Sequence, residues 1–443
     1  MPRKIRLTPV RLLVIGYLAV ILLGTILLIL PFSSKIPGRA DFMDALFTTV
    51  SASCVTGLIL HDTFQYWSGF GQVVILLLIQ MGGVGFMTII FLLLKLSGKK
   101  IGLKERTFMQ ESVSAPNVAG MVKLTSTILL GTLIFEAAGA IVLAFRFVPD
   151  FGWGQGIWFA VFTSVSSFCN AGFDLMGARG TPFASLTSYA GDPIICLTVP
   201  LLILIGGLGF AVWKDLCDNK FRLRRLALHT KLVLVMTAVM VVVPTAIIMI
   251  AERGMPFGDL LLNSFFTAVS PRTAGFNVLD LTSVQTATVF VTIGCMFIGG
   301  SSGSTAGGIK TNTFAVLFLS LVSFIRGKRS VECFGRRIDD DNVKTASRFV
   351  TLYLLFAALG VVLICLFEQG KGFELTEIVF EVFSAIGTVG LTLGITPSLC
   401  VGSELVLSCL MFLGRAGCLT VMLSLRTPSA PAAELPVEKV RIA

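Results

Sequence analysis

Long runs without a charged side chain constrain this chain more than any other feature of its sequence. The clearest runs span 19, 25 and 20 residues, at Leu12–Leu30, Phe70–Leu94 and Leu232–Ala251. A helix needs about 20 apolar residues to cross the hydrocarbon core of a bilayer. Charged residues are only 14% of the chain, whereas soluble domains carry roughly 25%. The sequence therefore predicts a polytopic membrane protein and argues against a soluble enzyme.

Eight apolar segments follow one another, which predicts an all-α protein with eight transmembrane helices. They cover about 8–31, 70–95, 123–145, 193–213, 231–251, 284–325, 349–367 and 404–425. The first is too long for the core of a signal peptide and is predicted to be a retained span. Counting the connections together with the segment ends beside them, 26 basic residues lie in one alternating set and six in the other. The positive-inside rule then places both termini in the cytoplasm.

A fourfold repeat lies in the connections of the second, less basic set. The four stretches read FTTVSASCVTGL, FTSVSSFCNAGF, FFTAVSPRTAGF and FEVFSAIGTVGL, each with a phenylalanine ten residues before a glycine. The glycines are Gly57, Gly172, Gly275 and Gly390, spaced 115, 103 and 115 residues apart. A serine lies six residues before the glycine in three repeats, at Ser51, Ser166 and Ser384, and Val269 takes that place in the third.

These stretches predict four reentrant pore loops. A short helix would begin near Asp41, Gln155, Asp259 and Thr376, and the chain would return in an extended segment through the glycine. Irregular backbone is tolerated at membrane depth only where it lines water or is buried in protein. Glycine permits positive φ, and the negative ends of the helix dipoles would favour a cation. The alternative, four ordinary loops with a turn glycine, does not account for the shared register.

The motifs CVTGL, CNAGFD, RTAGFN and GTVGLT resemble the Trk/Ktr/HKT superfamily of potassium transporters, most closely the Ktr-type membrane subunit. The resemblance covers residues 1 to about 425, and SPRTAGFN is its most specific piece. It implies four M1-P-M2 pseudo-repeats around one pore, a homodimer in the bacterial inner membrane, and gating by a cytosolic nucleotide-binding ring. The nucleotide is then expected on the partner, with K⁺ as the only ligand of this chain; Na⁺ activation stays open.

The pseudo-repeats are placed at 1–98, 99–218, 219–330 and 331–425, followed by a cytoplasmic tail at 426–443. A carbonyl ring that replaces the hydration shell of K⁺ is predicted from three residues of each repeat. They are Val55, Thr56 and Gly57; Asn170, Ala171 and Gly172; Thr273, Ala274 and Gly275; and Thr388, Val389 and Gly390. In the plant relatives a serine at the first glycine position accompanies sodium transport, so Gly57 favours potassium.

The sixth apolar segment is interrupted by GGSSGSTAGGIKT. It lacks the spacing of a Walker A loop, and both histidines precede it, which argues against an intramembrane serine protease. The resemblance implies a gating loop, and a purely structural kink is the alternative. The predicted gate is Gly299, Gly300, Ser301, Ser302, Gly303, Ser304, Thr305, Ala306, Gly307, Gly308 and Arg415.

Arg415 lies deep in the last apolar run, where a charge is costly and usually faces a partner or water. Cys418 stands where the resemblance leads us to expect proline, so either the local helix is straighter or the position has been altered. The motifs GGVGF at 82–86 and GGLGF at 206–210 suggest close-packing faces, with bending as the alternative. Glu136 is interpreted as a structural glutamate rather than a residue of the ion path.

The leading hypothesis is a channel-like K⁺ uptake subunit. The alternative is a Na⁺- or H⁺-coupled cation symporter in which Glu136 or Arg415 takes part in coupling. An enzyme is not expected, because the sequence places no histidine, metal-binding set or carboxylate pair for catalysis. The basic loops suit anionic lipid headgroups or an acidic partner ring, and nothing points to nucleic acid as a partner.

Overall fold

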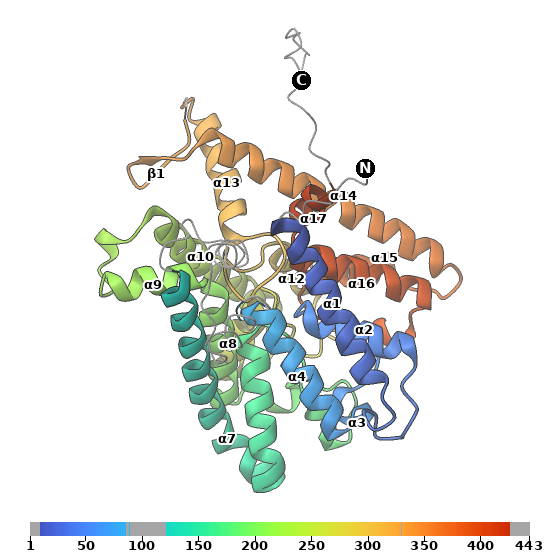
Figure 1. Cartoon of the computed structure of the whole chain (residues 1–443). Coiled ribbons are helices and arrows are strands. Elements are labelled where there is room, and N and C mark those ends of the chain that lie inside the picture. The colour runs from blue at the N-terminus through green and yellow to red at the C-terminus, as the bar shows by residue number, and fades with distance from the viewer. Residues whose placement is uncertain (1–8, 86–87, 89–120, 329, 426–443) are drawn as a thin grey trace.

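The fold is almost entirely helical in a computed structural model that describes residues 9–85, 88, 121–328 and 330–425 (Figure 1). The helices are α1 (Pro9–Ile29), α2 (Phe42–Ser53), α3 (Thr63–Tyr66), α4 (Gly69–Val84), α7 (Met121–Phe168), α8 (Pro193–Leu208), α9 (Phe210–Asp218), α10 (Leu228–Ala251), α11 (Phe257–Val269), α12 (Thr286–Phe297), α13 (Thr311–Ile325), α14 (Asp340–Phe367), α15 (Leu375–Gly387), α16 (Val401–Ala416) and α17 (Cys418–Leu425). Four 3₁₀ turns, η1 (Met176–Arg179), η2 (Thr187–Tyr189), η3 (Leu223–Arg225) and η4 (Thr396–Ser398), and one hairpin of β1 (Glu332–Cys333) and β2 (Arg336–Arg337) complete the elements.

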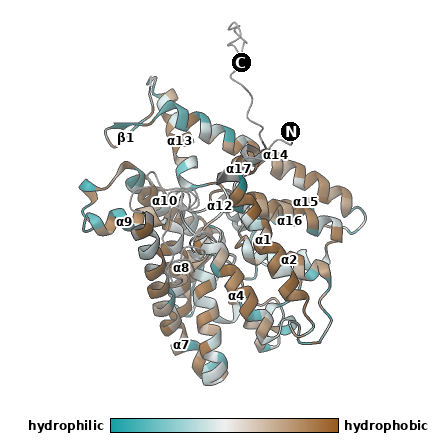
Figure 2. Ribbon diagram, in the orientation of Figure 1, coloured by the Kyte–Doolittle hydropathy of each residue, from teal (hydrophilic) through white to brown (hydrophobic). Residues whose placement is uncertain are grey.

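Four helices in the described part of the chain are long and apolar enough to cross a membrane. They are Arg11–Ile29, Thr125–Phe168, Leu228–Ala251 and Asp340–Phe367. A fifth span results if α8 and α9, which are bent by 88° at their junction, count as one. Apolar residues cover these helices, whereas hydrophilic residues gather at α9 and at the β-hairpin (Figure 2). The chain is therefore a multi-pass membrane protein, and the number of eight spans stays a prediction.

The short helices α2, α11 and α15, which precede glycine segments, are buried mainly in their C-terminal halves. In α2, every residue from Phe47 to Ser53 is buried, although the helix carries several hydroxyl groups. The long helix α10, in contrast, buries only five of its 24 residues. A buried polar centre beneath an apolar exterior is what a membrane protein requires when its middle carries a polar path.

Acidic residues mark the starts of these short helices. Asp41 caps α2 by accepting a hydrogen bond from Phe42 N at 2.7 Å, and Asp44 lies in the first turn. Asp259 lies in the first turn of α11, and Glu377 of α15 accepts from the backbone nitrogen of Glu374 at 2.9 Å. Negative charge is favourable at a helix N-terminus because the macrodipole is positive there. These caps agree with the predicted starts of the first, third and fourth pore helices.

The second pore helix follows the preceding span without a connecting loop. Both the span and the pore helix lie within α7, which has a break at Gly152, where φ is 77°. The predicted start near Gln155 therefore lies within the helix that follows this break. Proline at position 149 and glycine at position 152 allow the chain to turn there without a connecting loop.

Glycines end the helices that follow the pore loops. Gly85 ends α4, Gly209 separates α8 from α9, and Gly417 separates α16 from α17, with φ values of 89°, 97° and 84°. The predicted interruption of the sixth segment is present, because α12 ends at Phe297 and α13 begins at Thr311. The break at Gly417 occurs without a proline, so Cys418 does not leave this helix straight.

Candidate ion pathway

The four glycines of the repeat lie side by side in a closed ring. A Cβ built on Gly57 would lie 2.5 Å from the carbonyl oxygen of Ala171, and one on Gly172 would lie 2.7 Å from that of Ala274. Gly275 faces the carbonyl of Val389 in the same way, and Gly390 faces that of Thr56, which closes the ring. Each glycine thus leaves room for the backbone of the next repeat, and a side chain at any of these positions would force that backbone to shift.

The backbone of the four segments follows one pattern. The glycines have φ values of 96°, 73°, 82° and 94° in chain order. The residue two positions earlier also has positive φ, although none of these is glycine: Val55 at 57°, Asn170 at 59°, Thr273 at 74° and Thr388 at 52°. Such conformations cost about 1–3 kcal/mol each and concentrate at functional sites. Four matched outliers in one ring make it the candidate functional centre of the fold.

Serine hydroxyls attach the first and fourth segments to their helices. Ser51 Oγ accepts a hydrogen bond from Gly57 N at 3.0 Å, and Ser384 Oγ accepts one from Gly390 N at 3.0 Å. In the third repeat, which has Val269 at this place, Ser270 takes over. Its carbonyl accepts from Gly275 N at 3.3 Å and its hydroxyl donates to Phe276 O. The repeat that departs from the sequence pattern is therefore held by the next residue.

The interrupted stretch between α12 and α13 lies directly against this ring. Thr305 donates its hydroxyl proton toward Phe168 O and Asn170 Oδ1, which both lie 3.2 Å away. A Cβ on Gly299 would lie 3.0 Å from Thr273 Cγ2, and one on Gly307 would overlap Thr388. The loop therefore contacts the second, third and fourth segments of the ring.

Arg415 connects this loop to the first repeat. Its guanidinium donates to the carbonyl of Thr305, to Gly82 O and, at 3.2 Å, to Gly83 O. Gly414 and Arg415 follow the pattern of Gly82 and Gly83, because a Cβ on Gly82 or on Gly414 would strike the end of a pore helix. Arg415 therefore stands where the first repeat has a second glycine.

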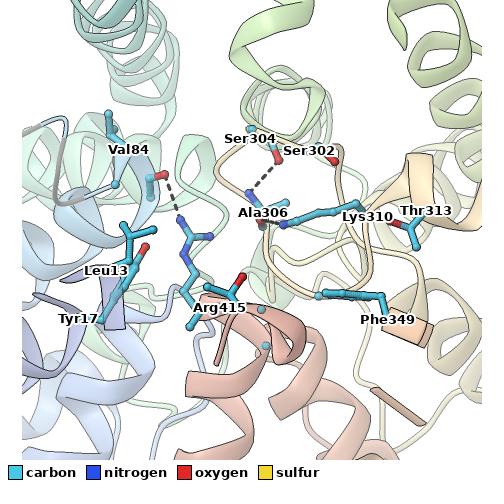
Figure 3. A pocket seen from close by; sticks show the side chains of 18 of the residues that line it. Leu13, Tyr17, Val84, Ser302, Ser304, Ala306, Lys310, Thr313, Phe349 and Arg415 are labelled. Atoms are coloured by element: carbon cyan, nitrogen blue, oxygen red, sulfur yellow. Dashed lines mark hydrogen bonds between the residues drawn. The ribbon is translucent and has the colours of Figure 1, made fainter. Parts of the chain in front are cut away.

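Lys310, two residues after the loop, is a second cation beside it, and the sequence analysis assigned it no role. Its Nζ donates to Ala306 O at 2.6 Å and to Gly307 O at 3.3 Å. Lys310 folds back on Ala306 from one side and Arg415 approaches from the other (Figure 3). The only advance signal was a lysine next to a glycine-rich interruption in an apolar run.

A cavity of about 270 Å³ adjoins the loop. Its lining includes Arg415, Lys310 and loop residues 302–304, together with Tyr17 of α1 and Phe349 of α14 (Figure 3). None of the twelve ring residues lines it, whereas Thr305, one residue beyond this lining stretch, contacts the ring. The loop therefore separates the ring from the cavity.

The glycines of GGVGF and GGLGF serve both close packing and bending, the two interpretations of these motifs. A Cβ on Gly82 would lie 2.6 Å from Val55 Cγ2, and one on Gly206 would lie 2.9 Å from Thr305 Oγ1, so these glycines allow close packing. Three residues on, Gly85 and Gly209 end the helices at positive φ. Phe86, the last residue of GGVGF, lies outside the described part of the chain.

Glu136 is buried beside the second segment. Its Oε2 accepts a hydrogen bond from Gln80 Nε2 at 3.2 Å, and Cys169 Sγ lies 3.8 Å from Oε1. Cys169 directly precedes Asn170, so Glu136 lies behind the ring segment. Its hydrogen-bonded position is consistent with the structural interpretation.

Comparison with known proteins places these features in a family. The TrkH family of cation transport proteins matches residues 13–434. The potassium/sodium uptake protein NtpJ of Enterococcus hirae is 41% identical over 95% of this chain and 93% of its own, and the Ktr system potassium uptake protein B of Bacillus subtilis is 40% identical with the same coverage. The crystal structure of the potassium transporter TrkH from Vibrio parahaemolyticus shares the fold, with a TM-score of 0.74, 17% identity and coverage of 96% of this chain and 86% of that one. The chain therefore belongs to the TrkH family of cation transport proteins.

Proposed function

We propose that this chain forms the K⁺-selective, channel-like pore of a potassium uptake system. The observation that carries the proposal is the closed ring of four glycine segments with matched positive φ values. In a β-strand successive peptide groups point to opposite sides, and positive φ at alternate residues breaks that pattern. Carbonyl oxygens aligned in this way replace the hydration shell of an ion in a selectivity filter.

The same arrangement supports potassium as the ion. All four positions are glycine, and the neighbouring carbonyl lies where a Cβ would be, so the ring has no room for a side chain. Relatives at 40% and 41% identity are described as potassium uptake and potassium/sodium uptake proteins. K⁺ at the twelve ring residues is therefore the ligand that we propose.

The loop from Gly299 to Gly308 is proposed as the gate, with Arg415 and Lys310 as the residues that hold it. The loop contacts three of the four ring segments, and both cations donate to its carbonyls. A fixed positive charge beside the path also repels cations, more strongly at low dielectric. Both effects act in the same direction, toward a closed pore.

The wider assembly is proposed from the family. A relative at 40% identity is named as one protein of a Ktr system, which favours a regulatory partner for this chain. We propose a cytosolic nucleotide-binding ring as that partner, a homodimer of this chain, cytoplasmic termini, and a nucleotide bound by the ring rather than by this chain. Activation by Na⁺ is a further property to be measured in the same assembly.

Flux in reconstituted vesicles tests the proposal. Purified protein is placed in vesicles with a K⁺ gradient, and uptake is measured with Na⁺ and H⁺ gradients separately imposed or abolished. A channel-like pore carries K⁺ down its electrochemical gradient alone and discriminates against Na⁺. Uphill K⁺ movement driven by Na⁺ or H⁺ would instead establish the symporter, and absence of K⁺/Na⁺ discrimination would reject the selective ring.

A further inference from the structure

A buried carboxylate lies behind the fourth segment of the ring. Glu381 of α15 has no solvent-exposed surface, and both of its oxygens accept hydrogen bonds from hydroxyl groups. Thr392 Oγ1 donates to Oε2 at 2.8 Å, and Thr396 Oγ1 donates to Oε1. A buried carboxylate is costly unless it is hydrogen-bonded, so these two partners are needed for its burial.

The two hydroxyls belong to the chain that leaves the ring. Thr392 lies two residues and Thr396 six residues after Gly390. Thr392 Oγ1 also accepts from the backbone nitrogen of Gly394 at 3.0 Å, which fixes the turn between them. Glu381 therefore holds both ends of the stretch from 392 to 396 against the pore helix.

The same helix face holds the ring itself. Ser384 lies three residues after Glu381, one helical turn along, and accepts from Gly390 N at 3.0 Å. The fourth segment is thus attached to α15 at Gly390, Thr392 and Thr396. If the segment moved away from the helix, Glu381 would lose its partners while it remained buried.

This attachment differs from those in the other repeats. The position nine residues before the glycine is Thr48, Thr163 and Phe266 in the first three repeats and Glu381 in the fourth. Glu381 is therefore the one carboxylate at this position of the fourfold repeat. The fourth segment of the pseudo-symmetric ring is thus held by a carboxylate that the other three repeats do not have at this position.

We propose that Glu381 is a positioning residue that fixes the fourth ring segment and so determines how strongly the ring discriminates K⁺ from Na⁺. This inference rests on the proposed function of the ring. A carbonyl ring selects an ion by the spacing and number of its oxygens. A segment that is free to shift away from α15 changes that spacing without blocking the path.

The test measures the K⁺/Na⁺ preference of reconstituted protein, from competition of the two ions with Rb⁺ uptake. Glu381→Gln and Thr396→Val each lose part of this hydrogen bonding, so we expect the ratio to fall about fivefold in each. Thr396→Ser keeps the hydroxyl and should keep the ratio. Because both residues act through the same hydrogen bond, the double variant should lose less than the product of the two single losses.

The matched control is Glu377→Gln, one turn earlier on α15. It removes the same charge from the same helix, and its side chain still accepts from Glu374 N. The ratio should stay at the wild-type value.

Several outcomes would overturn the inference. These are an unchanged ratio in both Glu381→Gln and Thr396→Val, an equal loss in Thr396→Ser, or an equal loss in the Glu377→Gln control. Thr396→Val preserves side-chain volume and decides the question if Glu381→Gln does not assemble. A wild-type protein without K⁺/Na⁺ discrimination would reject the proposed function itself, which is a separate result.

Discussion

The guanidinium of Arg415 donates a hydrogen bond to the backbone carbonyl of Thr305, 110 residues earlier in the chain. The hydroxyl of Thr305 in turn points toward Asn170 of the ring. One residue of the interrupted loop therefore contacts a cation of the last repeat on one side and the second ring segment on the other.

Replacing Gly57 by serine should lower K⁺/Na⁺ selectivity about tenfold while the protein still assembles, because a Cβ there meets the carbonyl of Ala171 at positive φ. Gly180→Ser is the matched control, since Gly180 has a similar φ of 93° but nothing within 4 Å of a built Cβ. Competition of K⁺ and Na⁺ for uptake measures the ratio. Equal ratios in the two variants would contradict the filter assignment.

Arg415→Gln should raise K⁺ flux several-fold, because it removes a positive charge and the bonds to the carbonyls of Thr305 and Gly82. Arg348→Gln, at an exposed position on α14, removes the same charge and should leave flux unchanged. Flux per assembled protein in vesicles is the measurement. A lower flux in correctly assembled Arg415→Gln would make this residue structural rather than part of a barrier.

Lys310→Met should also raise flux, because it releases the carbonyls of Ala306 and Gly307. Combined with Arg415→Gln, it should give less than the product of the two gains, since both residues hold the same loop. A fully multiplicative increase would indicate two independent barriers. Shortening the loop between Gly299 and Gly308 should reproduce the gain and weaken dependence on any regulatory partner.

Glu368, at the end of α14, should make folding stability depend on acid pH. Burial alone raises its pKa, but hydrogen bonds from Cys400 N, at 2.7 Å, and from Lys371 lower it to about 2. Its contribution is therefore full above the ordinary value near 4.5 and is lost as pH falls toward 2. Glu368→Gln should lower the melting temperature in detergent at pH 6 by a few degrees, with a smaller difference from wild type at pH 3. An equal difference at both pH values would contradict this.

The ring could be placed from the sequence because its signal is a spacing repeated four times. The conformations of Val55 and Thr388 could not, because β-branched residues avoid positive φ and only the assembled ring imposes it. The contacts of Arg415 with Gly82 and Gly83 join repeats more than 300 residues apart, and no local pattern encodes such a pairing. The break at Gly417 was not predicted, although its three-residue spacing from Gly414 is the same as in Gly82–Gly85 and Gly206–Gly209.

The boundary of the second pore helix shows a different limit. The predicted start near Gln155 lies three residues after Gly152, where the chain turns. The sequence did not show that this turn needs no connecting loop. The role of Lys310 was missed for a related reason. In the sequence, a lysine beside small residues only indicates that the apolar run is interrupted. The folded structure shows that carbonyls of the loop face the ammonium group of Lys310.

The ring is built from four segments of a single polypeptide, each with its own sequence around a shared glycine. In a homotetramer a single codon change would alter all four sides of a pore at once. Here it alters one side and leaves three intact, so mutation can change the four sides of the proposed filter one at a time. A single gene of this kind can therefore encode a filter with one altered side, which a channel of four identical subunits does not form.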